Sequence, residues 1–154
     1  MLCAVFLLGF VLKTEAQIHV YANDRFYYAD MLVNMENGRV QPGYDRTWTH
    51  TMLTLQNHKI FKGFSSSAFD VLFRIEEYQL YLGDSQFSGD ILYTYKNGKI
   101  YKGDSTFPLD LVYTVHQGGV YEGDSKLIFD QILWLDGLFN AEELFTILLA
   151  LEML

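Results

Sequence analysis

The residues best suited to chemistry in this 154-residue sequence are carboxylates in short Gly-Asp-Ser segments. Three aspartates each stand six residues before a second one: Asp84 and Asp90, Asp104 and Asp110, Asp124 and Asp130. With a serine hydroxyl between them, these oxygens are ligands that suit calcium. Aspartate and serine in a tight turn also accept hydrogen bonds from nearby backbone N–H groups. We expect this structural use, with calcium binding as the alternative.

A second candidate is the stretch around His50. Aspartate recurs every twenty residues after it, at Asp70, Asp90, Asp110 and Asp130, and His50 takes the place of the aspartate expected at residue 50. Trp48 lies two residues earlier, and Pro42 and Tyr44 make the same stretch irregular. A histidine beside a tryptophan in an irregular loop is suited to hold a ligand, or to form the centre of an enzyme or inhibitor site. The alternative is that this stretch is a degenerate copy of a repeated unit, in which the His50 side chain packs against its neighbours and binds no ligand.

Other signatures of catalysis are absent from the sequence. It has no Gly-rich phosphate loop and no serine elbow, and Cys3 is the one cysteine. The remaining histidines, His19, His58 and His116, fall at positions unrelated to one another, so no metal-ligand spacing occurs. We therefore expect a non-catalytic protein with no cofactor and no metal.

The charge balance narrows the class of partner. Lys and Arg total 11 against 19 Asp and Glu, which gives a formal net charge of -8. Phosphate backbones are bound by basic patches, and none occurs here, so we expect no nucleic-acid partner. A peripheral anchor to anionic lipid is disfavoured for the same reason.

The first sixteen residues have the form of a secretory signal peptide. Leu2 to Leu12 is an unbroken apolar run, and small residues follow it up to Ala16. Such a run is too short to span a bilayer as a helix, and a small-residue cleavage site is typical of export. No Lys or Arg precedes the run, so the start is atypical. We expect a secreted or periplasmic protein without a stable transmembrane anchor; a buried first strand is the alternative.

A period of twenty residues organises the rest of the chain. One apolar position recurs six times without insertion or deletion, at Val20, Val40, Ile60, Leu80, Ile100 and Val120. The next position is aromatic in five copies, at Tyr21, Phe61, Tyr81, Tyr101 and Tyr121, with Gln41 as the exception. Repetition this strict indicates one small structural unit used six times.

That unit is predicted to be a β-hairpin. Asn97-Gly98 separates two runs rich in β-formers, and this pair favours a two-residue type I′ turn. Tyr95 then pairs with Ile100, and Thr94 with Tyr101. We expect a core face of Ile91, Tyr93, Tyr95 and Ile100. Its equivalents are Leu53, Leu55 and Ile60 in the hairpin with the Asn57-His58 turn, and Phe73, Ile75 and Leu80 in the hairpin with the Glu77-Tyr78 turn. The turns at Asn57-His58 and Glu77-Tyr78 lack glycine and should be the weakest.

We predict an all-β fold of six hairpin repeats over residues 17–139, followed by a C-terminal capping helix over 140–154. Asn140 with Glu143 three residues later is a helix-start signature. A repeat array needs a cap over its last unit, although such a tail also suits a partner or a membrane surface. We prefer consecutive hairpins to a parallel solenoid, and whether the hairpins form an open meander or close into a ring stays open.

The repeated tyrosines are the candidate ligand-binding residues, together with Trp48 and His50. Tyr81, Tyr101 and Tyr121 recur at one place in the repeat, and aromatic rings beside carboxylates can stack on sugars. Regularly placed aromatic residues also form cross-strand ladders. We expect a structural or binding module whose ligand is a carbohydrate or a protein.

The segment "NGKIYKGDSTFPLDLVYT" (97–114) resembles the tandem "IYKGxS…DxLYT" repeats of small bacterial proteins. The resemblance covers the third to sixth copies best, and it implies a β-repeat fold without a known activity. A more distant likeness is to MORN repeats, in which Tyr-x-Gly opens a hairpin unit, as at 81–83, 101–103 and 121–123. The later glycines and the tryptophan of MORN units have no counterpart here.

Overall fold

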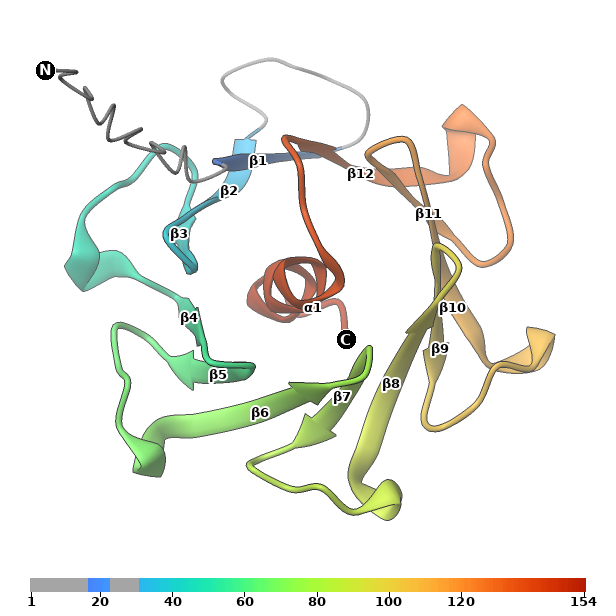
Figure 1. Cartoon of the computed structure of the whole chain (residues 1–154). Coiled ribbons are helices and arrows are strands. Elements are labelled where there is room, and N and C mark those ends of the chain that lie inside the picture. The colour runs from blue at the N-terminus through green and yellow to red at the C-terminus, as the bar shows by residue number, and fades with distance from the viewer. Residues whose placement is uncertain (1–16, 23–30) are drawn as a thin grey trace, which may run out of the picture.

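Antiparallel hairpins surround a central helix in the computed structural model, which describes residues 17–22 and 31–154 (Figure 1). The predicted signal peptide, residues 1–16, lies outside the described residues. The described strands are β1 (Ile18–Ala22), β2 (Met31–Glu36), β3 (Arg39–Pro42), β4 (Leu53–Gln56), β5 (Lys59–Lys62), β6 (Val71–Glu76), β7 (Gln79–Leu82), β8 (Ile91–Lys96), β9 (Lys99–Lys102), β10 (Leu111–His116), β11 (Gly119–Glu122) and β12 (Gln131–Asp136). Short 3₁₀ helices precede five of them: η2 (Trp48–His50), η3 (Ala68–Asp70), η4 (Ser88–Asp90), η5 (Pro108–Asp110) and η6 (Ile128–Asp130).

The predicted two-residue turn is confirmed at the tip of β8 and β9. Asn97 and Gly98 have φ of 52° and 75°, and Tyr95 pairs with Ile100 and Thr94 with Tyr101. The Gly98 carbonyl also accepts the N–H of Val115 on the next hairpin, at 2.7 Å. A Cβ at Gly98 would lie 2.9 Å from the Val115 carbonyl oxygen. Glycine is therefore favoured here both by the positive φ and by the close neighbour.

Two turns keep this geometry without glycine. His58 and Tyr78 hold the second turn position with φ of 62° and 68°. Their carbonyls still accept an N–H from the next hairpin, from Ile75 and Tyr95, each at 2.8 Å. A left-handed backbone costs a residue with a Cβ about 1–2 kcal/mol, so the predicted weakness of these two turns has a physical basis.

The ring of hairpins is closed, which decides between the arrangements that the sequence left open. The sixth hairpin is formed by the two ends of the chain, because β12 pairs with β1 through Leu135–Val20 and Trp134–Tyr21. Val20 lies opposite Leu135 in this hairpin, as Ile100 lies opposite Tyr95 in the hairpin of β8 and β9. Every strand of the described sheet therefore has two neighbours, and neither an open meander nor a solenoid is formed.

A bulge between neighbouring hairpins corrects one prediction about the core. Leu80 pairs with Tyr93, but Tyr81 pairs with Ile91, so Leu92 is an extra residue in β8. Beyond this bulge the alternation of faces is reversed. Ile91 consequently shares a face with Tyr81 and is buried outside the central cluster, and its assignment to the core face was wrong. The assignments for the hairpins with the Asn57-His58 and Glu77-Tyr78 turns are confirmed, since their residues belong to the central core or pack against it.

The predicted C-terminal helix is present as α1 (Ala141–Ala150), and it fills the centre of the ring (Figure 1). The Asn140 carboxamide accepts the N–H groups of Glu142 and Glu143, and the Glu143 carboxylate accepts the Asn140 N–H, as the capping box predicts. A closed ring has no end to cover, so the helix buries all of its sides instead. Its most buried residues are Leu144, Phe145, Thr146, Ile147 and Leu148. Within the described part of the chain, no helix has the length and apolar character to cross a membrane.

A recurring side-chain contact across twenty-five residues joins four of the hairpins to the next one. Lys59 donates to Asp84 and Lys99 to Asp124, each at 2.5 Å. Gln79 makes the equivalent bond to Asp104 at 2.7 Å. At the same place in the second unit, the Arg39 guanidinium lies 4.3 Å from the centre of the Phe64 ring. The same contact is thus an ion pair, an amide–carboxylate hydrogen bond or a cation–π contact, depending on the unit.

Removal of β1 should open the ring. A chain that begins at residue 23 loses the buried Ile18 and Val20 and exposes one edge each of β2 and β12. We expect loss of the cooperative thermal transition and aggregation, measured by circular dichroism and light scattering. A chain that begins at residue 17 is the control and should melt cooperatively. A cooperative transition in both would show that closure is dispensable.

Two phenylalanines test the importance of the central helix. Phe145→Ala should lower the free energy of unfolding by about 3–5 kcal/mol, because the Phe145 side chain on α1 is fully buried. Phe69→Ala removes the same group from a side chain that is 99% exposed, and should leave stability nearly unchanged. Urea denaturation of both variants measures the difference.

Candidate ligand-binding site

The linkers between hairpins share a corner closed by serine and aspartate. In the fourth unit, Ser85 Oγ donates to Asp90 Oδ2 at 2.5 Å and accepts the N–H of Phe87 at 3.1 Å. The same pair recurs as Ser65–Asp70, Ser105–Asp110 and Ser125–Asp130. The serines of the Gly-Asp-Ser segments therefore accept backbone N–H groups as expected. The aspartates of these segments, Asp84, Asp104 and Asp124, instead accept hydrogen bonds from side chains of the preceding hairpin. Among the described residues, no three acidic, histidine or cysteine side chains are grouped so as to hold a metal ion.

The linker of the second unit keeps this corner with donor and acceptor exchanged. Asp45 stands in the serine place and His50 in the aspartate place, and the imidazole Nδ1 contacts Asp45 Oδ2. Asp45 Oδ1 accepts the N–H of Thr47 at 2.7 Å, as the serine hydroxyl does elsewhere. The hydrogen bonds from His50 and Thr47 hold the pKa of Asp45 at about 2, below its ordinary value of 3.8. His50 therefore departs from the repeat in chemistry but not in its role within the loop.

Two buried side-chain amides hold the main chain of this linker. Asn34 donates to the carbonyls of Gly43 and Asp45 at 2.7 and 2.9 Å. Gln41 donates to the carbonyl of Thr47 at 2.9 Å. Gln41 is the one exception in the aromatic column, and its amide accounts for that exception. The irregular linker is thus held firmly, which limits the motion of the side chains that it displays.

An exposed aromatic pair lies between the second and third linkers. Trp48 and Phe64 meet edge to face, with ring centres 5.3 Å apart. Their exposed fractions are 59% and 49%, so both rings present surface to solvent. Arg39 lies over the Phe64 ring and completes a cluster that we call the Trp48 platform (Arg39, Trp48 and Phe64).

A small depression adjoins the platform. It has a volume of about 110 Å³ and is lined by Arg39, Thr54, Gln56, Phe64, Ser65 and Ser66. Guanidinium, amide and hydroxyl groups therefore lie beside an exposed ring. Flat aromatic surface next to donors and acceptors of hydrogen bonds is suited to a small polar ligand with an apolar face.

The tyrosines predicted to bind ligand lie elsewhere and offer little ring surface. Tyr81 and Tyr121 are 9% and 8% exposed, and Tyr101 is half-buried. The Tyr81 hydroxyl donates to Gln79 Oε1 at 2.9 Å. Burial also raises the pKa of Tyr81 above its ordinary value. Their role in binding stays a prediction, and the structure does not bring them together with Trp48 and His50.

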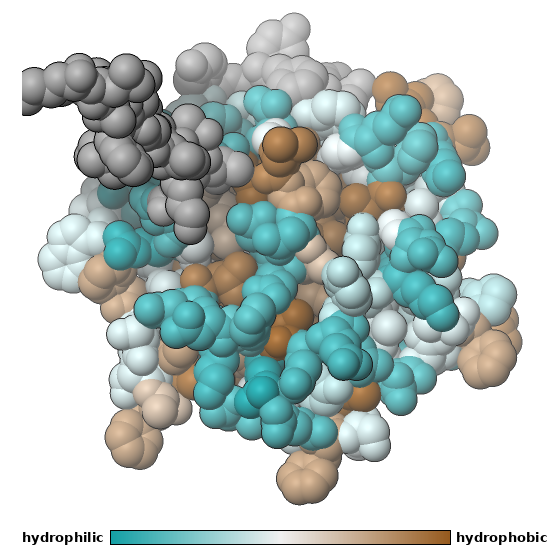
Figure 2. Space-filling model, viewed as in Figure 1, coloured by the Kyte–Doolittle hydropathy of each residue, from teal (hydrophilic) through white to brown (hydrophobic). Residues whose placement is uncertain are grey.

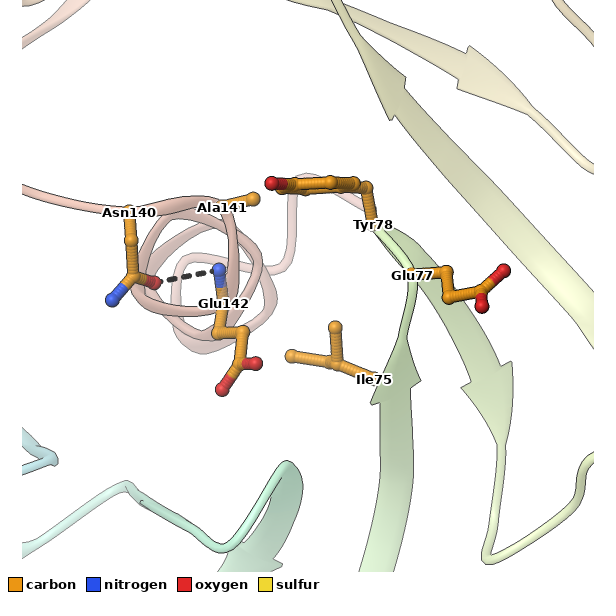
Figure 3. Close-up of a pocket in the computed structure, with 6 residues that line it drawn as sticks. All are labelled: Ile75, Glu77, Tyr78, Asn140, Ala141 and Glu142. Atoms are coloured by element: carbon orange, nitrogen blue, oxygen red, sulfur yellow. Dashed lines mark hydrogen bonds between the residues drawn. The ribbon is translucent and has the colours of Figure 1, made fainter.

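A larger cavity opens at the turn end of the ring, beside the start of α1 (Figure 3). Its volume is about 440 Å³, and it is lined by Ile75, Glu77, Tyr78, Asn140, Ala141 and Glu142. The Glu77 carboxylate points away from it, and the Asn140 oxygen is bound to the helix N–H groups. His58 contacts Glu142 Oε1 at 2.6 Å. The Tyr78 hydroxyl and the Asn140 amide nitrogen are the polar groups that remain in this lining. The Trp48 platform adds an exposed aromatic pair to its polar groups, so we take the platform as the candidate site.

Sequence reasoning found Trp48 and His50 but missed Phe64 and Arg39. A signal for Phe64 existed, because it interrupts the column that holds Asp84, Asp104 and Asp124. Its partner Arg39 lies twenty-five residues earlier, the same separation as Lys59 and Asp84. That separation becomes visible only when the hairpins are placed side by side.

The exchanged corner predicts an unusual carboxyl titration. In the wild type, the Asp45 carboxyl should titrate near pH 2, and in His50→Ala its midpoint should move up toward 3.8. Because the pKa is lowered in the folded protein, the stabilising effect of Asp45 is complete above about pH 4 and is lost as the pH falls toward 2. NMR titration of the side-chain carboxyl measures the midpoint. Ser125→Ala is the control and should leave it unchanged.

Comparison with known proteins agrees with this architecture. The family model described as "6-fold beta flower protein" matches residues 20–148, which include β2 to β12 and most of β1 and α1. No curated protein and no solved structure matched the chain. The expectation of tandem β-hairpin repeats is confirmed, while the likeness to MORN units stays a prediction. With six hairpins in a closed ring and this match over most of its length, the chain belongs to the 6-fold beta flower family.

Proposed function

We propose that this protein is a non-catalytic binding module that recognises a carbohydrate at the Trp48 platform. The observation that carries the proposal is the exposed edge-to-face pair of Trp48 and Phe64 beside a polar depression. Sugar rings have apolar C–H faces that stack on aromatic side chains, and hydroxyl groups at their rims that need hydrogen bonds. Arg39, Gln56 and Ser66 are placed to supply those bonds.

The rigidity of the linker supports this function. Asn34 and Gln41 hold the main chain of residues 43–47, and the Asp45–His50 contact closes the loop. A preformed site loses less entropy when a ligand binds. A protein ligand is the other partner class that suits an exposed aromatic pair, since Trp and Arg are enriched in protein interfaces.

Export belongs to the same proposal and rests on the sequence of residues 1–16. An apolar run followed by small residues is typical of a cleaved leader. Mass spectrometry of the protein outside the producing cell would give a chain that begins at Gln17. A product that stays in the cytoplasm with residues 1–16 attached would exclude export.

An enzyme or inhibitor centred on His50 is the second candidate, and the contact between Asp45 and the imidazole favours it. A carboxylate that orients a histidine is a common part of general-base sites. The variant Asp45→Ser/His50→Asp restores the corner found in the other linkers and should fold as the wild type does. A carbohydrate ligand should still bind this variant, whereas a catalytic activity that depends on His50 should disappear.

A glycan array tests the proposed function. The wild-type chain should bind a defined set of glycans, and Trp48→Ala should weaken binding about tenfold or more by removing the stacking surface. Arg39→Ala should weaken it as well. Phe87→Ala is the matched control, because it removes an exposed aromatic residue from another linker. Absence of glycan binding, or equal binding by Trp48→Ala and the wild type, would exclude this site.

A further inference from the structure

Two cavities adjoin at the turn end of the ring. The first, of about 440 Å³, lies between the turn of β6 and β7 and the start of α1 (Figure 3). The second has a volume of about 400 Å³ and is lined by Tyr78, Tyr95, Lys96, Asn97 and Gly98. Tyr78 belongs to both linings, so the two cavities meet at its side chain. Each volume lies within the range of small-molecule sites.

Tyr78 stands at a turn position where the repeat favours glycine. Gly38, Gly98 and Gly118 hold this position in three other hairpins, each with positive φ. Tyr78 keeps the same geometry at φ of 68°, although a side chain makes a left-handed backbone less stable. Its ring is 64% exposed and reaches toward Ala141 at the start of α1 (Figure 3). A residue held in a strained conformation beside a cavity is typical of a ligand-binding position.

Three neutral groups of these linings are free to donate hydrogen bonds. Within the described part of the chain, the hydroxyls of Tyr78 and Tyr95 and the amide nitrogen of Asn140 have no hydrogen-bond partner. Burial raises the pKa of Tyr95 above its ordinary value, so its hydroxyl keeps its proton at neutral pH. Carbonyl oxygens of a ligand are suitable acceptors for such donors.

The charged groups around the cavities are paired, turned outward or exposed to water. His58 contacts Glu142 Oε1 at 2.6 Å, and the Glu77 carboxylate points away from the first cavity (Figure 3). Lys96 in the second lining is exposed, so water screens its charge. The Asn140 oxygen accepts N–H groups of the first helical turn, which are therefore not open to an anion. This arrangement favours a neutral ligand over an ion.

We propose that the two cavities form a second binding site, for a small neutral aromatic molecule that carries carbonyl groups. The flat body of such a molecule packs against the Tyr78 ring, with Ile75 and Ala141 as further apolar surface. Its carbonyl oxygens accept hydrogen bonds from Tyr95 and Asn140. Figure 2 shows apolar surface between hydrophilic residues in the middle of the ring, where α1 lies in Figure 1.

Coumarin, a neutral two-ring lactone, is the probe that tests the proposal. The full chain should bind coumarin in ligand-observed NMR, and it should bind naphthalene, which lacks a carbonyl group, about tenfold more weakly. The carboxylate and aminomethyl derivatives of coumarin carry a negative and a positive charge. Both should bind more weakly than coumarin, because each brings an unpaired charge into the site.

Tyr78→Gly restores the turn residue of the other hairpins, so loss of binding in this variant is not a loss of folding. Its melting temperature should equal or exceed that of the wild type, and its affinity for coumarin should fall about tenfold. Tyr95→Phe should weaken binding about threefold through the lost hydrogen bond. Tyr93→Phe is the matched control, because it removes the same hydroxyl from a residue of β8 that lines neither cavity.

Three results would overturn the proposal: no binding of coumarin by the wild type, equal binding by Tyr78→Gly, or tighter binding of a charged derivative, which would assign the cavities to an ion. The platform and its depression share no residue with these linings. Trp48→Ala should therefore bind coumarin as the wild type does. Loss of coumarin binding in that variant would place the probe at the Trp48 platform and contradict a second site.

Discussion

Closure of the sheet by β1 and β12 is the interaction on which the rest of the structure depends. With this pairing every described strand has two neighbours, and the hairpins enclose α1 on all sides. Closure also constrains the repeat. An insertion within the strands or the turn of one unit would shift its register against the next hairpin and disturb the pairing of the last strand with the first.

Within that frame, the same contact is made by different chemical groups. The link across twenty-five residues is an ion pair for Lys59 and Asp84, an amide–carboxylate bond for Gln79 and Asp104, and a cation–π contact for Arg39 and Phe64. The linker corner is Ser–Asp in four units and Asp–His in the second. Exchange of this kind leaves the scaffold intact while the side chains that a linker displays change, as in the Trp48 platform.

Much of the local structure could be predicted from the sequence, because turns and strand pairs are set by near neighbours. Asn97-Gly98 fixed its hairpin and register, and Asn140 with Glu143 located the start of the helix. Closure could not be predicted, since a period gives no angle between successive units. The position of Ile91 was missed because an extra residue at Leu92 reverses the faces, and no residue type marks that bulge.

The candidate site was less predictable than the fold. Trp48 and His50 stood out as interruptions of the repeat, but the partner of Trp48 comes from the next unit, and only the packing of hairpins brings Phe64 beside it. The burial of Tyr81 and Tyr121 was also hidden, because their neighbours across the bulge lie in other hairpins. Contacts between neighbouring units therefore could not be predicted from the repeated sequence of a single unit.

The division of the sixth hairpin between the two ends of the chain has a consequence for biosynthesis. As a ribosome delivers the chain, β1 appears first, but its partner β12 and the helix that fills the centre come last. The earlier hairpins can form as they emerge, since each depends on a local turn. The finished core must wait for α1, and until then the inner faces of the hairpins stay open to water and to other chains. A chain that stops before α1 has five complete turns and no centre around which to assemble.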